Sequence, residues 1–114
     1  MPTIENDYRF KVIIIIILNF PKLYDIFEKQ LIKIKFTNNS LHEVKEVIFS
    51  MIRNNSDVSY NQLIENLKKR DLIKFLGDFK LDVIFSKFRS SDKRINIDES
   101  KKVLEELIYM VSNN

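Results

Sequence analysis

The sequence predicts an all-α fold, a compact bundle of about six short helices around a buried first helix rich in isoleucine. The 114 residues include one glycine and two prolines, too few for the turns of an all-β sandwich. Hydrophobic residues make up 45% and charged residues 31%, a balance typical of globular chains. Apolar residues recur at helical spacing along most of the chain. We therefore expect a single helical domain over residues 1–114.

The first helix is expected from about Asp7 to Asn19 and contains the apolar run Val12–Leu18. β-branched residues favour a strand locally, but Pro21 blocks its continuation and the next segment has helical spacing. An apolar run that covers all sides of a helix predicts burial on all sides. Seven residues fall short of the roughly 20 that span a membrane, so we expect a core segment.

The second helix is expected to start at Pro21, which suits a first helical position, and to end near Lys33. Its apolar residues recur every fourth position, at Leu23, Phe27 and Leu31. A short extended connector, Ile34–Phe36, is expected after it.

The third helix follows the capping residues Thr37–Ser40 and is expected to end at Asn54-Asn55. Its apolar stripe comprises Leu41, Val44, Ile48, Met51 and Ile52. Its opposite, solvated face is expected to carry His42, Glu43, Lys45 and Glu46.

The fourth helix begins at Ser59, because Ser59 and Gln62 have the spacing of a capping box. Lys68, Lys69 and Arg70 close it, where cations meet the negative helix end. The residues expected to face inward are Leu63, Ile64 and Leu67.

Two further helical regions complete the predicted bundle. Gly77 separates a short helix (Leu72, Ile73 and Leu76) from another with Phe79, Val83, Ile84 and Phe88. The last helix is expected from Asn96 or Asp98 to about Val111. Its inner face comprises Leu104, Leu107, Ile108 and Val111, while Val103 and Met110 point elsewhere.

The chain offers little of the chemistry that catalysis requires. The absence of cysteine excludes disulfides, thiolate metal sites and a cysteine nucleophile, and it fits a cytoplasmic protein. The single histidine, His42, excludes a histidine metal pair and is expected to be a solvated surface residue. One glycine cannot build a nucleophile elbow or a phosphate-binding loop. We therefore predict a chain that is not an enzyme and has no cofactor and no metal.

The net charge of +3 is unevenly spread. The span Lys68–Arg94 holds nine basic and four acidic residues. Such a span could bind phosphates, so a small nucleic-acid-binding helical protein is one alternative function.

Four segments together resemble a known family: Val12–Leu23 (VIIIIILNFPKL), Phe27–Leu41, Val44–Ile52 and Phe88–Glu99. In this order they resemble the C-terminal, helicase-binding domain of bacterial replicative DNA primase, especially the alphaproteobacterial type. The first segment is similar to the family's apolar helix ending in Asn-x-Pro-x-Leu. The last is similar to the loop that leads into its late helix. The resemblance covers most of the chain.

The resemblance implies a helical bundle that binds the N-terminal domain of the ring-shaped replicative helicase and so recruits primase to the replication fork, within the primosome. Primer synthesis belongs to the family's zinc-binding and polymerase domains, whose Cys and Gly motifs are not found here. The family usually continues beyond the position of Asn114 into a helical hairpin that makes much of the helicase contact. We therefore expect a non-catalytic binding module without that hairpin.

The partner-binding residues are expected on the last helix and in the loop before it. The candidates are Phe88, Arg89, Tyr109 and Met110, because aromatic residues, arginine and methionine are enriched at interfaces. Core packing of Phe88 and an ordinary surface position for Arg89 remain open alternatives. The N-terminal domain of the helicase itself has a similar helical bundle and is the other alternative identity.

Overall fold

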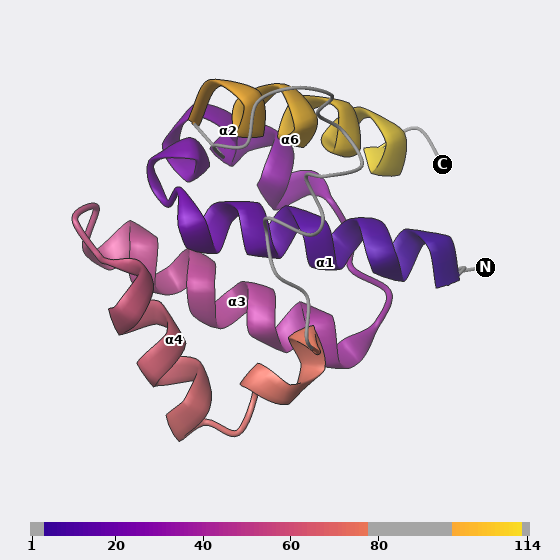
Figure 1. Cartoon of the computed structure of the whole chain (residues 1–114). Coiled ribbons are helices and arrows are strands. Elements are labelled where there is room, and N and C mark those ends of the chain that lie inside the picture. The colour runs from indigo at the N-terminus through magenta and orange to yellow at the C-terminus, as the bar shows by residue number, and fades with distance from the viewer. Residues whose placement is uncertain (1–3, 78–96, 113–114) are drawn as a thin grey trace.

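The computed structural model describes residues 4–77 and 97–112, which form five α-helices and one 3-10 helix (Figure 1). Their bounds are α1 Ile4–Asn19, α2 Lys22–Lys33, α3 Asn39–Asn54, α4 Tyr60–Lys69, η1 Ile73–Leu76 and α6 Ile97–Ser112. No strand occurs in this part of the chain, and the all-α fold predicted from the sequence is confirmed. The helix predicted beyond Gly77, with Phe79, Val83, Ile84 and Phe88, lies outside the described residues.

Helix α1 lies at the centre of the fold. It contacts α2, α3, α4 and α6. Figure 1 shows α6 and α2 on one side of it and α3 on the other. Every side chain from Val12 to Leu18 is buried. Burial of each such side chain contributes roughly 1.5–3 kcal/mol, which outweighs the local strand preference of the isoleucines. The predicted central helix is thus confirmed.

A two-residue connection, Phe20-Pro21, joins α1 to α2. The Phe20 N–H donates to the Ile16 carbonyl at 2.9 Å, and the Leu23 N–H donates to the Phe20 carbonyl at 2.9 Å. Pro21 lacks an N–H and has φ −56°, a value already suited to a helix start. The predicted start and end of this helix agree with the structure to within one residue.

Asn38 caps α3 and ties it to α1. Its side-chain oxygen accepts a hydrogen bond of 3.0 Å from the Leu41 N–H, as in a regular N-cap. Its Nδ2 donates to Asp7 Oδ2 at 3.4 Å. Of the predicted apolar stripe, all but Met51 are buried, and Met51 is half-buried.

The prediction of a solvated polar face on α3 was wrong at Lys45. It was expected in solvent, yet only 6% of the residue is exposed. Its Nζ lies 5.2 Å from the centre of the Phe36 ring and 3.5 Å from Glu46 Oε1. The Phe36 ring also stacks on the Phe10 ring, with 4.5 Å between their centres. Lys45 is therefore buried against an aromatic ring, while its charge stays close to a carboxylate.

Helix α4 begins and ends with local hydrogen-bonded motifs. Gln62 N–H donates to Ser59 Oγ at 3.2 Å, and Ser59 N–H donates to Gln62 Oε1 at 2.8 Å, which confirms the predicted capping box. At the other end, the N–H groups of Asp71 and Leu72 donate to Lys68 and Leu67, respectively. This is a Schellman arrangement, and Asp71 has the left-handed φ of 59° that it requires.

The short helix predicted before Gly77 is a single 3-10 turn, η1. Gly77 ends it with φ 68° and ψ −155°, a conformation essentially restricted to glycine. Leu72 and Leu76 are buried, whereas Ile73 is half-buried. In α6 the buried residues are Ser100, Leu104, Leu107 and Ile108. The predicted inner residues Val111 and Ile64 are only half-buried, and both pack against the core.

Candidate functional site

Two of the four predicted partner-binding residues are on the surface of α6. The exposed fraction is 71% for Tyr109 and 42% for Met110. They follow Ile108, which faces the core, and successive helical residues are turned by about 100°. The structure therefore places these two adjacent residues outward together. Phe88 and Arg89 lie outside the described residues.

An acidic rim borders the exposed pair. Glu105 and Glu106 lie one helical turn before Tyr109 and Met110, and both are exposed. This end of α6 therefore offers an aromatic ring and a thioether for apolar contact, beside two carboxylates. Such a surface suits a protein partner that presents apolar side chains with basic neighbours.

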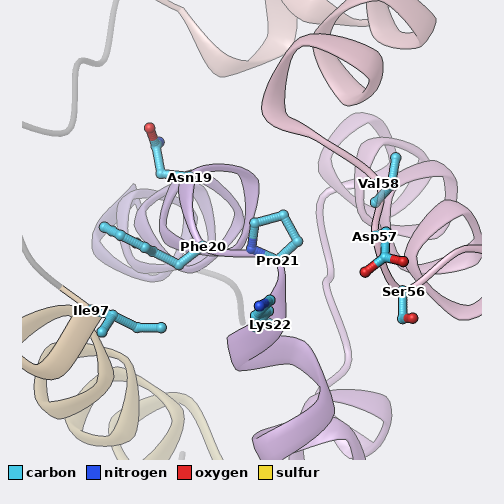
Figure 2. A pocket seen from close by; sticks show the side chains of 8 residues that line it. All are labelled: Asn19, Phe20, Pro21, Lys22, Ser56, Asp57, Val58 and Ile97. Atoms are coloured by element: carbon cyan, nitrogen blue, oxygen red, sulfur yellow. The ribbon is translucent and has the colours of Figure 1, made fainter.

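A second surface feature was not predicted from the sequence. A hollow of about 250 Å³ lies between the α1–α2 connection, the α3–α4 loop and the first residue of α6 (Figure 2). Figure 2 shows Phe20 and Ile97 on one side, Asp57 and Val58 on the other, and Pro21 and Lys22 between them. Asn19 and Ser56 complete the lining. We call the space bounded by these eight residues the α1–α2 hollow.

The α3–α4 loop is held in place by Asn55. The Asn55 N–H donates to the Met51 carbonyl at 3.0 Å, which ends α3. The side-chain oxygen of Asn55 accepts from the Asp57 N–H at 3.1 Å, and its carbonyl accepts from the Val58 N–H at 3.0 Å. These bonds direct Val58 into the core and leave Asp57 exposed beside the hollow.

The basic end of α4 is the third feature. Lys68, Lys69 and Arg70 are all exposed. Arg70 Nε donates to Asn66 Oδ1 at 3.1 Å, which ties its guanidinium to the helix. Lys74 Nζ, a turn further on, pairs with Asp71 at 2.8 Å. In the described part of the span Lys68–Arg94, the basic surface therefore consists of these three adjacent cations at the end of α4.

His42 is exposed on α3, as predicted, with Nε2 at 3.6 Å from Glu46 Oε1. Across residues 4–77 and 97–112, no group of three or more His, Cys, Asp or Glu side chains is placed to hold a metal ion. In the same ranges, no helix has both the length and the apolar character needed to cross a bilayer.

The described helices define the class of this molecule as an all-α bundle. Comparison with protein families, with curated proteins and with solved structures finds no match to the chain.

Proposed function

We propose that this chain is a non-catalytic protein-interaction module that docks on the N-terminal domain of the replicative helicase and recruits primer synthesis to the replication fork. The observation that carries the docking role is the adjacent exposure of Tyr109 and Met110 on α6. Tyrosine and methionine are enriched at protein interfaces, and tyrosine is among the residues that dominate binding energy. The partner is proposed from the order of the four segments that resemble the primase domain. A cytoplasmic location is part of this proposal.

Single alanine substitutions test the docking face. We expect Tyr109→Ala to raise the dissociation constant for the helicase N-terminal domain by about tenfold, the effect of losing about 1.4 kcal/mol at an interface anchor. Tyr60→Ala is the matched control, because Tyr60 is also exposed, at 46%, but starts α4. We expect Met110→Ala to have a smaller effect in the same direction. Equal affinities for the Tyr109→Ala and Tyr60→Ala variants would show that Tyr109 is not part of the interface.

The exposed cations of α4 favour a second candidate function, nucleic-acid binding. Lys68, Lys69 and Arg70 could contact phosphates directly. Binding through three phosphates predicts a slope of log K against log salt concentration of roughly −2 to −3. A protein interface with an apolar centre depends far less on salt.

One titration series distinguishes the two candidate functions, protein docking and nucleic-acid binding. Fluorescently labelled single-stranded DNA is titrated with the chain at several salt concentrations, and the helicase N-terminal domain is titrated in parallel. The Lys68→Glu, Lys69→Glu, Arg70→Glu triple variant abolishes binding to DNA if the second candidate is correct. Retained helicase binding by the same variant supports docking through α6.

A further inference from the structure

The α1–α2 hollow has an apolar interior and a charged margin. Phe20 and Pro21 are half-buried, Val58 is buried, and Ile97 keeps 41% of its surface exposed although it lines the hollow. Lys22 and Asp57 are exposed at its edge. Neither of these two charged side chains forms an ion pair within the described residues, so both charges are available to a partner.

The size of the hollow favours a side chain over a small molecule. Its volume, about 250 Å³, falls below the range of about 300–1,000 Å³ that is typical of cofactor and substrate sites. An apolar cavity of about 150 Å³ already accommodates a benzene molecule. The hollow therefore has room for one side chain of the size of phenylalanine or leucine.

We propose that the α1–α2 hollow receives one leucine- or phenylalanine-sized side chain from an amphipathic helix of the partner protein, which has an acidic residue beside it to pair with Lys22. This inference rests on the proposed docking function and adds a second anchor to it. Asp57, on the side of the hollow formed by the α3–α4 loop, selects a basic or neutral residue on the other flank of the anchor. Opposite charges at these two positions would fix the direction of the bound helix.

The surface beside the hollow suits a helix rather than an isolated side chain. Ile26 lies one turn after Lys22 on the same face of α2, and it is exposed. A partner helix with apolar residues four positions apart could place one in the hollow and the next on Ile26. The proposed contact is therefore wider than the hollow alone.

Helix α6 connects this anchor to the Tyr109–Met110 pair. Ile97 begins α6 and Tyr109 lies twelve residues later, which corresponds to about 18 Å along the helix. A partner that contacts both ends of α6 would bind more tightly, because both contacts lie on one rigid helix. The hollow contributes position and direction, and the exposed pair contributes apolar area.

The test measures affinity for the helicase N-terminal domain with two variants of the hollow. Ile97→Glu places a carboxylate at the mouth of the hollow, at a helix start where acidic residues are tolerated, and we expect at least tenfold weaker binding. Lys22→Glu reverses the marginal charge, and we expect at least threefold weaker binding. Ile32→Glu is the matched control, because Ile32 is 57% exposed near the end of α2 and does not line the hollow. Melting temperatures by circular dichroism verify that each variant is folded.

Methyl NMR of the native chain gives a second measurement that needs no substitution. We expect the Val58 and Ile97 methyl signals to shift on titration with the helicase domain and the Ile32 signal to stay in place. If the native chain binds but both variants bind equally well and these methyl signals do not move, the hollow is not an anchor while the docking function stands. If the native chain does not bind, both proposals fail. Concentration-dependent dimerisation that Ile97→Glu abolishes would assign the hollow to a second copy and overturn the inference.

Discussion

The guanidinium group of Arg53 donates a hydrogen bond of 2.9 Å to the phenolic oxygen of Tyr24, joining the end of α3 to the start of α2. Tyr24 is fully buried, and its ring lies 4.8 Å from that of Phe49. Arg53→Ala leaves the buried hydroxyl without this partner, and we expect it to lower the free energy of unfolding by about 1–3 kcal/mol. Urea denaturation measures the change. The same substitution in a Tyr24→Phe background should have a smaller effect, and equal effects in both backgrounds would show that the bond does not stabilise the fold.

The same tyrosine predicts a loss of stability at alkaline pH. Burial raises the pKa of Tyr24 above its ordinary value of about 10, and Arg53 offsets part of that increase. Above that pH the unfolded chain loses the phenolic proton while the folded chain retains it, so the free energy of unfolding falls as pH rises. We expect a steeper fall between pH 9 and 11 for the native chain than for Tyr24→Phe. Parallel pH profiles of the two chains would contradict this assignment.

Ile16 tests the central position of α1, because it is fully buried at the middle of the apolar run. Ile16→Asp places an unpaired carboxylate there, and several kcal/mol of destabilisation is expected to abolish cooperative unfolding. Ile15→Asp is expected to behave in the same way. Ile32→Asp, at an exposed position, should keep a melting temperature close to native. Native melting temperatures for both buried variants would show that α1 is not the centre of the core.

Ser100 is fully buried in α6, and its hydroxyl has no hydrogen-bond partner in the described structure. Ser100→Ala removes an unsatisfied polar group and improves helix propensity. We expect the free energy of unfolding to rise by about 1 kcal/mol, with a melting temperature higher by about 4 °C. Ser100→Leu should instead destabilise the protein through overpacking. A lower melting temperature for Ser100→Ala would mean that the hydroxyl has a stabilising partner.

Local sequence patterns predicted most of the fold. The capping box of Ser59 and Gln62 and the position of Pro21 each depend on neighbours within a few residues. The burial of Val12–Leu18 was predicted from an apolar run that covers all sides of its own helix. Spacing along one helix therefore suffices to predict them. Met110 was likewise predicted to lie outside the inner stripe of α6, and it is exposed.

Tertiary contacts account for what the sequence did not predict. Lys45 is buried because Phe36, nine residues earlier in an extended connector, lies beneath it. The α1–α2 hollow draws its lining from three segments centred near residues 21, 57 and 97. No periodic pattern relates these segments, so only the packing of the helices brings them together.

Calorimetric titration of the chain with the N-terminal domain of the replicative helicase tests the proposed docking most directly. We expect saturable binding with a dissociation constant below about 100 μM, weakened by Tyr109→Ala and little changed by added salt. Circular dichroism of the same sample establishes that the helical fold is intact. Absence of heat and of co-elution at about 100 μM, from a folded sample, would contradict the proposed docking.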